Sequence, residues 1–120
     1  MKVFWDDCGE GLPADDAKDV HLDEARLIWS DTVRGLEGNF LGLTDEQDKT
    51  VQFCYISDVP DDVEDARHLA IVLLDFPVAD RQGSYQRQVT IGEVQDLIVI
   101  AFRHGADPCL FGKVDFVPWS

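Results

Sequence analysis

The chain has 120 residues, of which 45% are hydrophobic, and its 24 Asp and Glu against 10 Lys and Arg give a net charge of −14. So strong a negative field repels nucleic acid and anionic membranes, whereas it attracts cations and basic protein surfaces. The size suits one compact domain over residues 1–120. Because the sequence shows neither a stretch of roughly 20 apolar residues nor a signal peptide, we expect a cytoplasmic protein.

The first third of the chain predicts one strand and one helix. Residues 2–5 are expected to form a short strand, and the polar segment after them contains Gly and Pro that interrupt regular structure. Apolar residues then recur at helical spacing, as Leu22, Ala25, Ile28, Trp29, Val33 and Leu36. Gly35 and Gly38 are stop signals for this first helix.

An antiparallel hairpin is predicted next. Residues 39–43 and 51–56 have the composition of strands, and the acidic turn 45–49 joins them. Val51, Phe53 and Tyr55 are expected to share one face of the sheet because side chains alternate along a strand. Residues 69–74 are apolar at every position, which indicates a central strand.

The last part of the chain predicts a second helix between two edge strands, residues 84–89 and 114–119. Thr90 and Glu93 have the spacing of a capping box, and the apolar stripe that follows ends at Gly105. The connections between the middle strands are short, which favours antiparallel pairing. The expected class is α+β, with a mainly antiparallel sheet of about five strands and two helices packed against it.

Neither the histidines nor the cysteines form a catalytic or metal motif. The three histidines lie far apart, without a His or Cys at zinc-motif spacing. The cysteines are few and widely spaced, so we expect reduced thiols and, at Cys54, a small buried apolar residue. The acidic segments also lack the ligand pattern of an EF-hand. We therefore predict no catalytic residue, no metal and no cofactor.

The negative charge is concentrated in one half of the sequence. Residues 1–66 carry 18 acidic against 5 basic side chains, a net −13, and residues 67–120 carry 6 against 5, a net −1. An acidic surface that serves only solubility or salt adaptation remains an alternative, although it would spread charge over all exposed segments. Carboxylates in solvated turns act as plain charges, which favours binding over catalysis. The expected partner is therefore a basic protein, and neither nucleic acid nor a membrane is expected.

Ten acidic residues are the candidates for binding this partner. They belong to the long loop after the hairpin, to the hairpin tip and to the end of the first strand. They are Asp58, Asp61, Asp62, Glu64, Asp65, Asp45, Glu46, Asp48, Asp6 and Asp7. The long loop and the hairpin tip leave the same strand from opposite ends, so one footprint is expected to include one of them, and we favour the loop.

One stretch of sequence resembles a known class of proteins. Residues 38–53, GNFLGLTDEQDKTVQF, are followed by an acidic loop, a hydrophobic strand and a late helix that opens at residues 89–94, VTIGEV. This order of segments is similar to that of the small acidic immunity proteins of bacterial polymorphic toxin systems. The resemblance implies a cytoplasmic inhibitor that occupies the active site of a cognate toxin, often a nuclease or a deaminase.

The sequence is also compatible with two other functions. A small metal-dependent or carboxylate-based enzyme using residues 58–65 would need two carboxylates and a histidine within about 4 Å in a pocket, with a raised pKa on one of them. An assembly subunit that pairs through the edge of the last strand would form a stable dimer and expose a large apolar patch.

Overall fold

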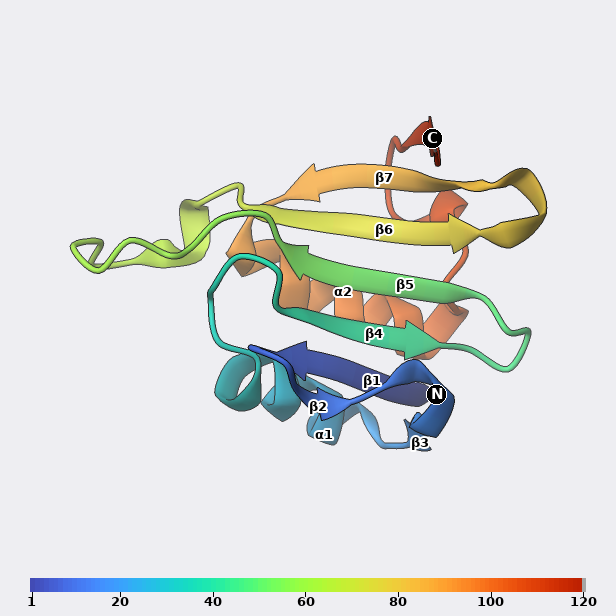
Figure 1. Ribbon diagram of the computed structural model, residues 1–120, viewed down its shortest axis with the longest axis horizontal. Coiled ribbons are helices and arrows are strands. Elements are labelled where there is room, and N and C mark those ends of the chain that lie inside the picture. The colour runs from blue at the N-terminus through green and yellow to red at the C-terminus, as the bar shows by residue number, and fades with distance from the viewer. Residues whose placement is uncertain (120) are drawn as a thin grey trace.

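The computed structural model describes residues 1–119, which fold around one antiparallel sheet (Figure 1). The order of the strands is β2-β1-β4-β5-β6-β7-β8, and β3 also pairs with β1. The strands are β1 (Lys2–Asp7), β2 (Glu10–Leu12), β3 (Lys18–Asp19), β4 (Phe40–Thr44), β5 (Thr50–Tyr55), β6 (Val72–Val78), β7 (Gly83–Val89) and β8 (Asp115–Pro118). The protein is therefore α+β, with an uninterrupted sheet.

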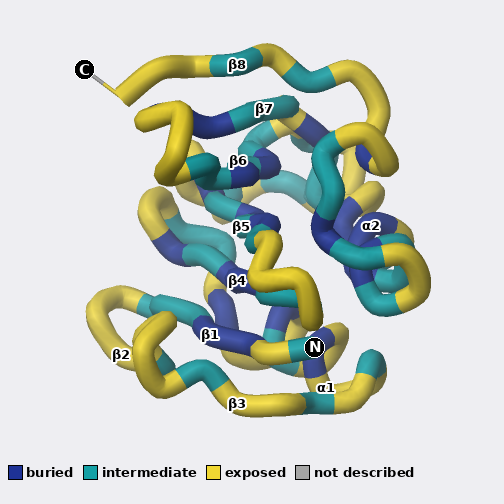
Figure 2. The backbone as a smooth tube through the Cα atoms, turned by 90° about the vertical axis from the view of Figure 1, so that its right-hand side faces the viewer, coloured by how far each residue is buried: buried dark blue, intermediate teal, exposed yellow. Residues whose placement is uncertain are grey.

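The helices lie on one face of this sheet, as the view along the strands shows (Figure 2). They are α1 (Leu22–Leu27), the π-helix η2 (Ile28–Thr32) and α2 (Ile91–His104), and four short 3₁₀ turns are η1 (Ala14–Asp16), η3 (Ala66–His68), η4 (Ala79–Arg81) and η5 (Pro108–Leu110). Between helices and sheet, Trp29, Phe53, Leu74 and Ile98 belong to one hydrophobic core. None of the helices within residues 1–119 is both long and apolar enough to cross a membrane.

The expectation of about five strands is wrong, because the sheet has eight within the described residues. The segment after β1, which was expected to lack regular structure, contains β2 and β3. Asp7 pairs with Glu10, so only Cys8 and Gly9 form the turn between β1 and β2. Both have a positive φ, 55° and 87°, as a two-residue hairpin turn of the favoured type requires. A cysteine rarely adopts this conformation, which is why the turn was missed.

The first helix is also shorter than expected. After Leu27 the α-helix continues as a π-helix, and Val33 donates its N–H to the carbonyl of Ile28 at 2.9 Å. The wider turn places both Trp29 and Val33 against the sheet, where they are 4% and 3% exposed. Leu36 lies outside the helix, because the regular helical spacing ends with the π turn.

The central strand begins three residues later than predicted, at Val72 instead of residue 69. Leu69 donates its N–H to the carbonyl of Ala66 and accepts the N–H of Ile91, so it joins η3 to the start of α2. An all-apolar strand is expected to be covered on both faces or on one face, and the structure covers this strand on one face. Val72 and Leu74 are buried under the helices, whereas Leu73, on the other face, is half-buried.

The hairpin and the second helix confirm the sequence analysis. Leu41 lies opposite Phe53 in β4 and β5, and the apolar positions of β5 are buried. The capping box at the start of α2 is complete: Thr90 Oγ1 accepts the N–H of Glu93, and Glu93 Oε2 accepts the N–H of Thr90 at 2.7 Å. Cys54 is partly exposed, and burial raises the pKa of its thiol to about 12, so the thiol stays protonated.

Candidate functional site

The acidic loop between β5 and β6 projects beyond the end of the sheet (Figure 1). Its residues 57–65 form neither helix nor strand, as expected of a segment rich in Asp with a proline at position 60. Two backbone hydrogen bonds anchor the base of the loop. Val59 donates its N–H to the carbonyl of Gly35 at 2.8 Å, and Ile56 donates to the carbonyl of Ile71 at 2.9 Å. The loop is therefore fixed at its base and exposed at its tip.

Gly35 allows the loop to pack closely on the segment after η2. A Cβ atom at this position would lie 2.4 Å from Cγ2 of Val59, which is well inside the ordinary carbon contact distance of about 3.5 Å. Next to this contact, Asp58 Oδ1 accepts the N–H of Glu37 at 2.7 Å. Asp58 therefore also holds the loop in place.

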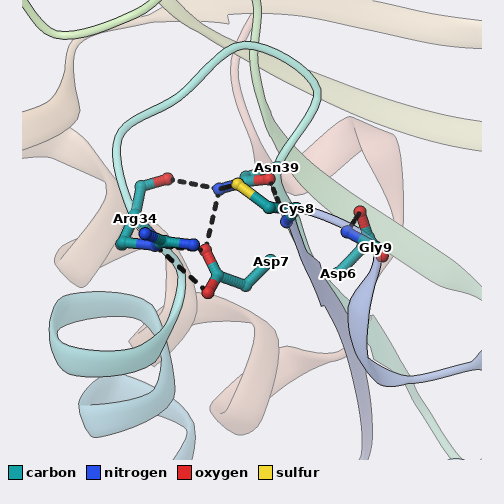
Figure 3. Close-up of polar contacts among 6 residues, drawn as sticks. All are labelled: Asp6, Asp7, Cys8, Gly9, Arg34 and Asn39. Carbon is teal, nitrogen blue, oxygen red and sulfur yellow. Dashed lines mark hydrogen bonds and ion pairs between the residues drawn. The ribbon is translucent and has the colours of Figure 1, made fainter.

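Asp7, at the end of β1, is paired with Arg34 (Figure 3). Arg34 Nε donates to Asp7 Oδ1 at 3.1 Å, and this hydrogen bond holds the pKa of Asp7 below its usual range. The Asp7 side chain is only 18% exposed. Its neighbour Asp6 accepts the N–H of Gly9 at 3.3 Å, which supports the turn into β2.

Asn39 is the buried centre of this network (Figure 3). Its Nδ2 donates to Asp7 Oδ1 at 2.9 Å and to the carbonyl of Arg34 at 3.0 Å, and its Oδ1 accepts the N–H of Cys8 at 2.8 Å. Asn39 is only 2% exposed. It joins the end of β1 to residues 34–35, on which the base of the acidic loop packs.

Asp65, at the far side of the loop, is paired with Arg67. The Arg67 guanidinium donates from Nε to Asp65 Oδ1 at 3.0 Å and from a terminal nitrogen to Oδ2 at 2.9 Å. Arg67 also donates its backbone N–H to Asp65 Oδ1 at 3.0 Å. The side-chain hydrogen bond from Arg67 is the main reason why the pKa of Asp65 falls to about 2.

Asp61, Asp62 and Glu64, in contrast, are exposed and make no side-chain hydrogen bond or ion pair with residues 1–119. We call the surface formed by residues 6–10, 33–38 and 57–68 the acidic end. It carries nine carboxylates against two arginines, and the arginines are those already paired with Asp7 and Asp65. The unpaired charge of the acidic end is therefore negative.

The hairpin tip, residues 45–49, lies at the opposite end of the strands (Figure 1). Asp45 Oδ1 accepts the N–H groups of Gln47 and Lys49, and Oδ2 accepts the N–H of Ala106, each at 2.9 Å. Its carboxylate is thus occupied by backbone donors, whereas Glu46 and Asp48 are exposed. Of the ten predicted residues, seven lie at the acidic end and three at the hairpin tip.

The remaining acids of the first half lie in η1, β3, α1 and η2. Because β2, β3, β1, β4 and β5 are neighbours in the sheet, the first 55 residues form one half of it. The charge difference between the two halves of the sequence therefore persists in space. Those other acids are Asp15, Asp16, Asp19, Asp23, Glu24 and Asp31.

A hollow of about 500 Å³ beside the hairpin tip contains both histidines and carboxylates, including His21, His104 and Asp107. The backbone N–H of Cys109 and the ammonium of Lys49 hold the pKa of Asp107 below its usual range. A lowered pKa is the opposite of what an acid catalyst needs at neutral pH. Within residues 1–119, no group of three or more His, Cys, Asp and Glu side chains is placed to hold a metal ion.

Sequence reasoning missed Gly35, Arg34 and Asn39, which shape the acidic end. Gly35 was interpreted only as a helix stop. Arg34 and Asn39 find their partners about 30 positions away, at Asp7 and Cys8, so no local spacing marks them. An asparagine directly after Gly38 was the one available signal, since it is a polar residue at the start of a buried strand.

Comparison of the chain with family models, with curated proteins and with solved structures finds no match.

Proposed function

We propose that the protein is a cytoplasmic binding module whose acidic end engages a basic protein, and that it acts as an immunity protein against a toxin such as a nuclease or a deaminase. The observation that supports this proposal is the state of Asp61, Asp62 and Glu64. They are exposed and unpaired at the tip of a loop whose base is fixed. Their charge is therefore available to a partner.

The physical basis of the proposal is electrostatic steering. A concentrated negative surface raises the association rate with a basic protein by about 10- to 1000-fold, and the effect falls as salt screens the charges. An enzyme that acts on nucleic acid presents a basic groove, to which a projecting acidic loop is complementary. A loop fixed at its base also loses less conformational freedom on binding than a mobile one.

The test uses the product of the neighbouring gene as the candidate partner. In the loop variant, Asp61, Asp62 and Glu64 are all replaced by Lys. We expect it to associate about 100-fold more slowly at low salt, with little difference from the original at about 1 M salt. Stopped-flow fluorescence measures the rates, and circular dichroism confirms the fold. Co-expression tests the second part of the proposal, since an immunity protein restores the growth of cells that produce the toxin.

The matched control reverses three exposed acids outside the acidic end, Asp15, Asp16 and Asp80. Both variants change the net charge equally. If the loop is the binding surface, the control slows association much less than the loop variant. Equal slowing would show that only the total charge matters, and unchanged association of the loop variant would contradict the proposed surface.

A second candidate function is pairing of two copies through β8. This strand ends the sheet order, and its Val117 and the nearby Trp119 are 41% and 50% exposed. An exposed edge strand with apolar side chains favours association with another strand. Light scattering tests this function, because a dimer has twice the mass of the chain and a monomer would contradict it.

A further inference from the structure

A groove of about 630 Å³ lies directly beside the acidic loop, between η2, the loop and the start of α2. Its lining is mostly apolar and includes Val33, Tyr55, Val59, Pro60 and Ile91. At its floor the rings of Trp29 and Tyr55 stack in parallel, with their centres 4.8 Å apart and 4° between their planes. A concave surface with an aromatic floor suits a large apolar side chain.

The arginines that line this groove are paired with aspartates, whereas one of its carboxylates is unpaired. Arg34 and Arg67 line it, but each is already paired with an aspartate, Asp7 and Asp65 respectively. Asp61 also lines the groove and has no such partner within residues 1–119. A positively charged ligand therefore meets unpaired carboxylate at the rim, whereas an anion finds the arginines occupied.

The groove continues along the helices. A second hollow of about 430 Å³ shares Ser30 and Gln95 with it and is also lined by Leu27, Asp23 and Arg26. The Nε of Arg26 donates to Gln95 Oε1 at 2.8 Å. Leu27 is 57% exposed, so it adds apolar surface to this second hollow. Two adjoining hollows can each take a side chain, so the combined surface suits a segment of chain.

We propose that this groove takes a large apolar side chain from a basic segment of the protein partner, while Asp61, Asp62 and Glu64 bind Lys or Arg on either side of it. The inference rests on the proposed function and adds the chemistry of the segment that is recognised. Charge complementarity selects this occupant. A second copy of the chain would bring another −14, and nucleic acid or a lipid headgroup would be repelled.

The test uses three synthetic pentapeptides as probes. The first has one tryptophan with two lysines on each side, the second has alanine in place of the tryptophan, and the third has glutamates in place of the lysines. We expect the first to shift the NMR signals of the Gly35 and Gly92 amides and the Trp29 indole. The second should bind at least tenfold more weakly, and the third should not bind.

Blocking the groove supplies the second measurement. Ser30→Trp places an indole where the two hollows meet, and we expect it to weaken binding of the tryptophan peptide at least tenfold. Thr32→Trp is the matched control, because Thr32 is exposed on the same π-helix and does not line the groove. The control should bind as the original protein does.

The outcomes separate this inference from the proposed function. Equal binding of the tryptophan and alanine peptides, or full binding to Ser30→Trp, overturns the apolar anchor. If the loop variant nevertheless associates slowly with the natural partner, the proposal that the acidic end binds a basic protein is still supported. If the loop variant associates normally but the tryptophan peptide binds in the groove, the proposed surface fails and the groove remains.

Discussion

The two ends of the sheet use the same residue type in opposite ways. At the hairpin tip, Asp45 accepts three backbone N–H groups, so its charge stabilises the turn. At the acidic end, Asp61 and Asp62 are exposed and accept none from residues 1–119. The difference arises because the tight turn directs backbone N–H groups at the carboxylate of Asp45, whereas no N–H group within residues 1–119 donates to those of Asp61 and Asp62. Acidity alone therefore does not indicate which carboxylates are available to a partner.

The acidic end consequently needs a scaffold of its own. Neighbouring unpaired carboxylates repel one another, which destabilises the folded chain. The buried Asn39 and two arginines oppose this repulsion by fixing the segments that carry the charge. The hairpin tip needs no such scaffold, since its backbone already satisfies Asp45.

The largest effect is expected for Asn39→Ala. The substitution removes a buried side chain and leaves the N–H of Cys8 and the carbonyl of Arg34 without their partner. We expect the free energy of unfolding to fall by about 2 to 3 kcal/mol, as measured by urea denaturation. Asp45→Ala at the other end should cost about 1 to 2 kcal/mol, because its donors lie closer to solvent. The reverse order would contradict the view that the acidic end depends on a buried centre.

The contact between Gly35 and Val59 predicts the next effect. In Gly35→Ala the new Cβ overlaps Val59, so the loop has to move and the protein loses about 1 to 2 kcal/mol. In a Val59→Ala background the overlap is relieved, and the same substitution should cost much less. A thermodynamic cycle over the four proteins measures the coupling. If the costs are additive, the loop does not rest on Gly35.

Strong local patterns in the sequence predicted the parts of the fold that depend on neighbouring residues. The alternation of β5 and the capping box of Thr90 and Glu93 are local and were confirmed. The missed strands β2 and β3 depend on pairing with β1 and on a positive φ at Cys8. Such features follow from tertiary contacts, which no local pattern contains.

The candidate site was predictable as a surface but not in its details. The sequence shows which segments are acidic and that the loop and the hairpin tip leave β5 from opposite ends. It does not show that Asp45 is bound by Ala106, 61 positions away. Nor does it show the groove beside the loop, which three separate segments create. The choice between free and occupied carboxylates therefore required the structure.

A smaller effect is expected when the free carboxylates are neutralised. Replacing Asp61 and Asp62 by Asn and Glu64 by Gln removes repulsion without removing a hydrogen bond within residues 1–119. We expect the free energy of unfolding to rise by about 0.5 kcal/mol at low salt. The gain should disappear at about 1 M salt, where the screening length is about 3 Å. Asp45→Asn should lower the free energy of unfolding instead. If both variants were less stable than the original protein, the two ends of the sheet would not differ in this respect.

The smallest effect is expected at Asp65, whose carboxylate is paired with Arg67. In Arg67→Gln the pKa of Asp65 should rise from about 2 towards the ordinary value of about 3.9, because its strongest hydrogen bond is lost. Asp65 has a lower pKa in the folded than in the unfolded chain, so the pair stabilises the protein above pH of about 4 and loses this contribution as the pH falls towards 2. The NMR titration of the Asp65 carboxyl carbon measures the shift. Arg34→Gln is the matched control, since it should raise the pKa of Asp7 and leave that of Asp65 near 2. An unchanged titration of Asp65 in Arg67→Gln would mean that the loop, and not the arginine, sets its pKa.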